Sequence, residues 1–172
     1  MVGEQTTERV APDEIDEWLT HQRNLQMRMA WDTQRDWIEQ TNPRVAFEVA
    51  IRYLNGMSVT DDQLAASNAV RQVVKSRMND LLADGAILCM PTSPTPAPPP
   101  DMPVPERVEL GVRIARLTCI GGMTGCPQIN LPLAEVDGLP VGLSLMGARG
   151  SDETLMRLAV EVEAEWSSRS VD

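Results

Sequence analysis

Eight of the chain's thirteen prolines lie between Pro91 and Pro105, in the run PTSPTPAPPPDMPVP. Proline fixes φ and has no backbone N–H, so this run fits neither a helix interior nor a central strand. It directly follows an apolar run without alternation, Ala86 to Met90, which is typical of a strand buried on both faces of an α/β sheet. An extended segment could also link two domains, but its place directly after a buried strand favours a loop over residues 91–105 that crosses one domain.

Helical spacing of apolar residues dominates the chain before this strand. A long helix is predicted from about Asp13 to the pair Asn42-Pro43. Asn42 and Pro43 are then expected to cap and open a second helix, which ends at Gly56. The run Thr60 to Gln63 has the pattern of a capping box, and it predicts a third helix that ends at Asp84-Gly85.

The pattern after the proline-rich loop is helix, hairpin, helix. Helical spacing runs from Glu106 to about Met123 and ends at closely spaced glycines and Pro127. From Gln128 the apolar period becomes two, and Asp137-Gly138 between two alternating runs predicts a β-hairpin. A last helix is expected after Ser151-Asp152, with Leu155, Leu158, Ala159, Val162 and Trp166 facing inward.

Size and charge narrow the class of protein. A chain of 172 residues, 42% of them hydrophobic, suits a single domain over residues 1–172, with residues 1–11 expected to be disordered. The net charge of −10, without a basic run, argues against a nucleic-acid partner. No apolar run approaches the length of a membrane helix and the N-terminus is polar and acidic, so no membrane association and a cytoplasmic location are expected.

The reactive side chains do not form a recognisable catalytic or metal-binding set. Cys89, Cys119 and Cys126 lie in apolar runs and are interpreted as buried thiols, so neither a metal nor a cofactor is expected. His21 falls on the polar side of the first helix, where an exposed histidine is expected. An autonomous hydrolase that uses His21 with Ser93 or a cysteine is a weaker alternative, because no base adjoins any nucleophile in the sequence.

Three stretches resemble the amidase signature family. They are DEWLTHQRNLQMRMAW (16–31), DGAILCMPTSPTPAP (84–98) and LTCIGGMTGCPQINLPLAEVDGLPVGLSLMGARGSDETLMRLA (117–159). The resemblance implies an α/β fold, the C-terminal part of the amidase signature fold, in which a mixed sheet with a C-terminal β-hairpin is covered by helices. General small-substrate amidases are the most similar branch. The amidotransferase branch has an acidic residue twelve positions before Pro127, where this chain has Ala115.

The resemblance implies amide hydrolysis by a serine nucleophile, a second serine on a cis peptide and a lysine base. A desolvated lysine can be neutral and accept a proton, so such a site requires a buried Lys. The family carries these groups in a Gly/Ser-rich signature that this sequence does not contain, and Lys75 falls on the polar side of a helix. No catalytic residue is therefore assigned within the chain.

The resemblance also implies that the last turns of the helix before Pro127 border the acyl side of the substrate. Leu117, Ile120, Gly121 and Thr124 are spaced to share one helical face, and they are the predicted substrate-binding residues. They could equally be core residues.

Two functional hypotheses follow. In the first, the chain supplies scaffold and part of the acyl-side pocket of an amidase, binds a small-molecule amide once completed, and is inactive alone. Its partner would be an amidase N-terminal half that carries the catalytic groups, or the chain would self-associate. In the alternative, it is a non-catalytic remnant or interaction module that folds as a domain or homo-oligomer.

Overall fold

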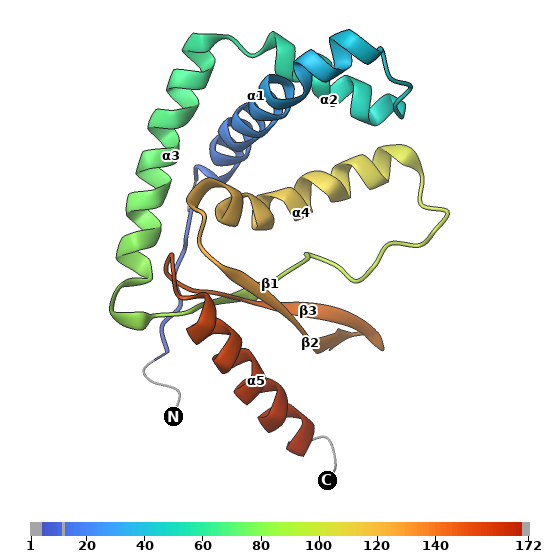
Figure 1. Ribbon diagram of the computed structural model, residues 1–172. Helices are drawn as coiled ribbons and strands as arrows, with labels where there is room; N and C mark the ends of the chain where they lie inside the picture. Colours follow the sequence, from blue (N-terminus) through green and yellow to red (C-terminus); the bar gives the residue numbers. More distant parts are fainter. Residues whose placement is uncertain (1–4, 12, 170–172) are drawn as a thin grey trace.

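The computed structural model describes residues 5–11 and 13–169. The elements in chain order are α1 (Ile15–Thr41), α2 (Phe47–Ser58), α3 (Asp61–Leu81), the 3-10 turn η1 (Ala83–Gly85), β1 (Leu88–Pro91), α4 (Val104–Thr124), β2 (Gln128–Val136), β3 (Leu139–Met146) and α5 (Asp152–Arg169). The strands form one sheet in the order β1-β3-β2. Figure 1 shows α5 against one face of this sheet and α4 on the opposite side, with α1 and α2 beyond α4, while α3 runs along one side of the molecule from α2 down to the sheet.

The expected α/β class and the hairpin covered by helices are confirmed: the fold is mostly helical, with a small three-stranded sheet. Every strand pairing in the described part of the chain is antiparallel, however, so the parallel component of a mixed sheet is not among these residues. The hairpin turn has φ of 52° at Asp137 and 77° at Gly138. Two successive positive φ values give the right-handed twist that joins antiparallel strands through a two-residue turn, which explains the Asp-Gly signal.

The third, fourth and fifth helices begin and end close to the predicted positions, and the capping box at Thr60 is confirmed. The Thr60 backbone N–H donates to Gln63 Oε1 at 3.0 Å, and the Gln63 backbone N–H donates to Thr60 Oγ1 at 3.2 Å. The prediction for Asn42 was wrong. It closes α1 in the left-handed region, with φ 41° and ψ 58°, and α2 begins only at Phe47. Asn tolerates this conformation better than other non-glycine residues, so it fits the end of a helix as well as the start.

Two clusters of buried side chains hold the helices to the sheet. The first joins α1, α3 and α4 to the end of β3, and it contains Trp18, Leu19, Val74, Met78, Leu82, Cys119, Ile120, Met123, Cys126 and Met146. The second joins β2 and β3 to α5 through Leu131, Leu133, Leu145, Leu155 and Ala159. Trp166, predicted to face inward, is 50% exposed because it lies beyond the end of this contact on α5.

Polar contacts add to the packing of α4 against α1 and α3. Arg116 Nε and Nη2 donate to the carboxylate of Asp16 on α1 at 2.7 and 3.1 Å. Arg71 Nε on α3 donates to the backbone carbonyl of Met123 at 2.9 Å, which satisfies a carbonyl in the last turn of α4. These contacts fix the end of α4 next to the hairpin.

The expectation that β1 is buried on both faces was wrong for this chain. Leu88 and Met90 pack against the first cluster, but exposure alternates along the strand and Cys89 is exposed. The physical reason is that α5 packs on β2 and β3, so that face of β1 has no cover. Residues 92–103 form a loop without helix or strand, as predicted.

The N-terminal expectation concerns residues 1–11. Residues 5–11 have no helix or strand, and Val10 and Ala11 pack against the first cluster. Residues 1–4 lie outside the described part of the chain.

Candidate functional site

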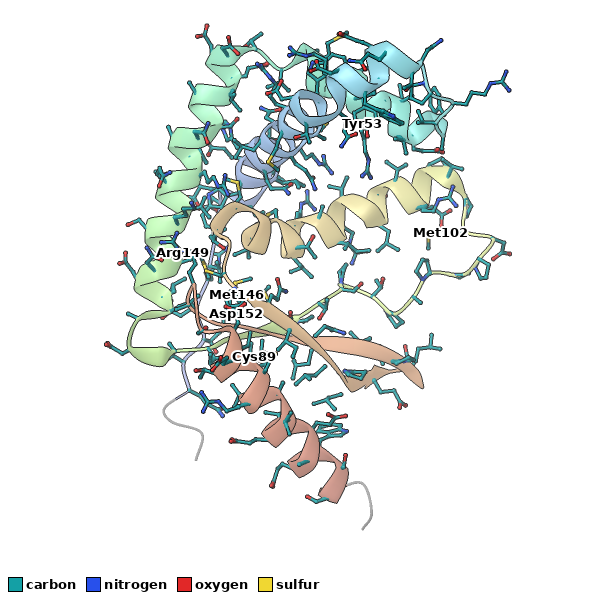
Figure 2. The ribbon with its side chains drawn as sticks, viewed as in Figure 1. Tyr53, Cys89, Met102, Met146, Arg149 and Asp152 are labelled. Carbon is teal, nitrogen blue, oxygen red and sulfur yellow. The ribbon has the colours of Figure 1, made fainter. Side chains whose placement is uncertain are left out.

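A groove lies between the proline-rich loop, the first half of α4 and the tip of the hairpin. Its volume is about 460 Å³. Met102, Leu110 and Leu139 are among the apolar side chains that line it. Figure 2 shows Met102 at the far end of the loop, just before α4 begins. A partly apolar hollow of this volume can bind part of a small organic molecule.

The charged lining residues of the groove are Glu106, Glu109, Arg113 and Asp137. Three of these four residues are acidic and only Arg113 is basic. The negative charge of the groove therefore disfavours the binding of an anionic ligand. Glu106 lies in the first turn of α4, where an acidic side chain interacts favourably with the helix dipole. The geometry is that of a binding surface.

The loop brings one unsatisfied hydroxyl to this groove. Ser93 Oγ donates to the Thr95 carbonyl at 2.7 Å and accepts from the Thr95 N–H at 3.4 Å, which fixes a tight local turn. Thr95 lines the groove, and its own Oγ1 is buried without a hydrogen-bond partner among the described residues. A buried hydroxyl without a partner is unfavourable, so a polar ligand atom or a water here would be stabilising.

A row of polar side chains follows the face of the sheet that is turned toward α4. Thr92 Oγ1 donates to Asn130 Oδ1 at 2.5 Å, and Gln128 Nε2 donates to Ser144 Oγ at 2.5 Å. Gly142 leaves the space that the Asn130 amide occupies, because a Cβ there would lie 1.9 Å from Asn130 Oδ1. These contacts link the residue that follows β1 to β2, and β2 to β3.

The predicted substrate-binding residues occupy two environments. Ile120 and Thr124 are buried in the first cluster and its surroundings, at 4% and 2% exposure, whereas Leu117 and Gly121 are partly buried. Thr124 Oγ1 donates to the Ile120 carbonyl at 2.7 Å and accepts from the Cys126 N–H at 3.2 Å. Its hydroxyl is therefore already satisfied within the chain.

The groove residues Leu110 and Arg113 lie seven and four positions before Leu117, hence on the same face of α4. None of the four predicted residues lines the groove, and their role in substrate binding stays a prediction; the groove residues of α4 lie one to two turns before Leu117. Helical spacing could have identified Leu110 and Arg113. No sequence signal marked Leu139 or Thr95, because the fold alone brings the hairpin tip and the loop to this helix.

The prediction for His21 was wrong. Its side chain is 19% exposed, and its Nδ1 lies 2.9 Å from Ser67 Oγ on α3. Ser67 is fully buried, and its hydroxyl donates to the Gln63 carbonyl at 2.7 Å. A serine held in this way inside a helix pair has no approach for a substrate, so we interpret the pair as a link between α1 and α3. Ser93 is engaged with Thr95, so the structure does not support its pairing with His21.

The cysteines also divide into two groups. Cys119 and Cys126 are buried as predicted, but Cys89 is exposed. Burial raises the pKa of the Cys119 thiol to about 11, although a backbone hydrogen bond and the charge of Arg23 act in the opposite direction. No three His, Cys, Asp or Glu side chains in the described ranges are placed to hold a metal ion.

The raised pKa of Cys119 predicts a loss of stability at high pH. The unfolded thiol ionises near its ordinary pKa, about 9, but the folded thiol ionises only near about 11. The free energy of unfolding therefore falls as pH rises between these values, by about 2 kcal/mol from about pH 8 to about pH 10.5. The free energy of unfolding, measured in urea at several pH values, should decline more steeply with pH in the wild type than in Cys119→Ala. Equal declines in the two proteins would contradict this prediction.

Comparison with known proteins identifies the family. The model of the amidase family matches residues 15–156. This chain belongs to the amidase signature family. "Amidase 1" of Oryza sativa subsp. japonica is 30% identical over 141 residues, which are 81% of this chain and 32% of the relative. "Outer envelope protein 64, chloroplastic" of Arabidopsis thaliana is 28% identical over 123 residues, 70% of this chain and 20% of that protein.

The amidase fold is also found in a solved structure. A crystal structure of an amidase matches with a TM-score of 0.75 and 23% identity, over 88% of this chain and 36% of that chain. The amidase-family chain thus spans about a third or less of the length of these proteins. In the part described by the structure, no helix combines the length and apolar character needed to cross a membrane.

Proposed function

We propose that residues 15–156 act as the C-terminal part of an amide hydrolase. They supply scaffold and part of the pocket for the acyl side of a small amide. The serine nucleophile, the second serine and the lysine base come from the rest of the amidase fold, in a longer chain or a separate one. A cytoplasmic location is part of this proposal.

The single observation that carries the proposal is the extent of the match. Most of this chain aligns with the amidase family, but with only 32% of the rice relative and 36% of the solved amidase chain. A nucleophile, a base and oxyanion donors must meet within hydrogen-bond distance, and no such set is present among the described residues. The role that remains for this part of the fold is to bind the substrate and to position it.

Uncovered apolar surface supports a larger assembly. On α2, Phe47 is 75% exposed, Leu54 54% and Met57 56%. A cluster of large apolar side chains on one short helix is costly in water and is typical of a surface that another part of a fold covers. The groove beside α4 is a separate surface, and we assign it to the ligand.

The test is a chimera of the rice Amidase 1 in which residues 15–156 of this chain replace the segment that they match. We expect the chimera to hydrolyse simple aryl and aliphatic amides, because binding surface and catalytic groups are then reunited. The isolated chain and the rice protein without that segment should both remain at background. A folded chimera without turnover would contradict the proposal and favour a non-catalytic module.

A pair of substitutions in the chimera tests the groove. Met102→Glu places a charge in the apolar lining, and we expect it to raise KM by about tenfold while kcat stays close to its original value. Val108→Glu is the control, because Val108 is 62% exposed on α4 and does not line the groove. Equal effects of the two substitutions would exclude the groove from substrate binding.

A further inference from the structure

Helix α2 carries a stripe of exposed apolar side chains. Six large apolar side chains between Val45 and Met57 are exposed to solvent. Phe47, Ile51 and Leu54 follow one another by four and three positions, which places them on one face of the helix. We call these three residues the α2 stripe. A contiguous apolar surface of this kind indicates a site of interaction with another macromolecule.

The α2 stripe faces away from the rest of the molecule. Gly56 lies two positions beyond Leu54, hence on the opposite face of α2. It is buried, and a Cβ there would clash with the backbone of Met27 on α1. Figure 1 shows α2 beyond α4, at the end of the molecule away from the sheet. A partner can therefore cover the stripe without closing the groove, which lies on the sheet side of α4.

Two opposite charges accompany the stripe. Glu48 follows Phe47 by one position and Arg52 follows Ile51 by one position, so both lie on the same side of the stripe. Both are exposed, and neither forms an ion pair with another described residue. Charges beside an apolar helical stripe select the partner and its orientation. This carboxylate and this guanidinium match the same two groups of an identical helix.

A two-fold axis makes this surface complementary to itself. In an antiparallel pair of identical helices each contact occurs twice, and the same side of each helix meets that of the other. With the axis midway between Phe47 and Leu54, each Phe47 lies level with Leu54 of the second copy. The midpoint of Glu48 and Arg52 is Ala50, next to that axis. Each carboxylate then lies beside a guanidinium, whereas a parallel pair would bring like charges together.

A hollow beside the stripe has room for an aromatic ring. Its volume is about 270 Å³, and Trp31, Ile38 and Leu54 are among the residues that line it. Among the described residues of its lining, none is charged. Leu54 belongs to both the stripe and the hollow, so the ring of Phe47 from the second copy can enter beside it. Phe47 is 75% exposed in the free chain, so its burial would contribute much of the association energy.

We propose that α2 is the interface of a homodimer in which the α2 stripes of two copies pack antiparallel. Glu48 of each copy pairs with Arg52 of the other. The self-complementary charges favour a second copy over another part of the amidase fold as the cover of this stripe. The inference does not depend on the proposed function, because the dimer leaves the groove open and forms without catalytic groups.

The size of the interface sets the expected affinity. α2 has 12 residues and is therefore about 18 Å long. One helix of this length buries less than the roughly 800 Å² per partner of a standard interface, so we expect a weak dimer with a Kd of roughly 10–100 μM.

Sedimentation equilibrium of the free chain from about 5 μM to about 500 μM measures this Kd. Glu48→Arg and Arg52→Glu each create two like-charge contacts, and we expect each to raise the Kd at least about tenfold. An equimolar mixture of the two variants should associate about as strongly as the wild type, because both ion pairs then form with reversed sign. Only a contact between the two residues across copies produces this recovery.

Two substitutions on α5 are the matched controls. Glu153 and Arg157 are exposed and have the same spacing as Glu48 and Arg52. Glu153→Arg and Arg157→Glu should leave the Kd within about twofold of the wild type. Circular dichroism of every variant checks that the helices are retained.

Three results would overturn the inference. They are a free chain that stays monomeric at all concentrations, an association that does not respond to Glu48→Arg and Arg52→Glu, and single variants whose mixture does not recover. None of these results bears on the turnover of the chimera with the rice Amidase 1. An inactive chimera, conversely, would contradict the proposed function and leave the dimer supported by the mixing experiment.

Discussion

Replacing Met78 with alanine is expected to lower the free energy of unfolding by about 2–5 kcal/mol. Met78 is fully buried on α3 and belongs to the cluster that joins α1, α3 and α4 to the end of β3. The substitution removes apolar contacts and leaves a cavity, which the surrounding helices can only partly close. Urea unfolding followed by circular dichroism measures the change.

Met29→Ala is the matched control for this prediction. Met29 lies on α1 and is 66% exposed, so the same truncation should change the free energy of unfolding by less than about 0.5 kcal/mol. Similar losses for the two variants would mean that Met78 is not at the centre of the core.

Gly56→Ala is expected to destabilise the contact between α1 and α2 by about 3 kcal/mol or more. A Cβ on Gly56 would lie 2.2 Å from the backbone oxygen and 2.9 Å from the carbonyl carbon of Met27, and 3.0 Å from Trp31 Cβ. Backbone atoms in the middle of a long helix cannot move aside as a flexible side chain can. The helices must separate, which hydrogen exchange of α2 should report as faster local opening.

Gly111→Ala provides the opposite case. Gly111 is in the interior of α4, and a Cβ there would meet nothing within 4 Å. Alanine has the better helix propensity, so a gain of up to about 1 kcal/mol is expected. A loss at Gly56 and a gain at Gly111 from the same chemical change would show that the close approach, and not glycine itself, is responsible. Two losses or two gains would contradict this interpretation.

The predictions that succeeded rest on local signals. The capping box at Thr60, the Asp137-Gly138 turn and the loop rich in proline each depend on φ, ψ and hydrogen bonds within a few residues. Asn42 failed for a local reason as well, because the same residue type is favoured at both ends of helices. Its conformation depends on how α2 meets α1, which neighbouring residues do not specify.

Of the residues that line the groove, helical spacing could have identified only those on α4. The face that carries Leu117, Ile120, Gly121 and Thr124 follows from helical spacing, and the same spacing extends it to Leu110 and Arg113 in the groove. His21 was misplaced because the apolar pattern of α1 says nothing about Ser67, a buried hydroxyl on α3 that fits its ring nitrogen. The periodicity of apolar residues does not predict contacts between elements that are far apart in sequence.

The sequence by itself determined which segments are helix, strand or loop, the family to which the chain belongs, and the absence of a catalytic signature from its residues. The tertiary structure alone decided what those segments meet. It brought the proline-rich loop and the hairpin tip to α4, paired His21 with Ser67 and left the edge of β1 exposed. The physical reason is that secondary structure is set by local backbone preferences, whereas burial and pairing depend on the surfaces that packing brings together.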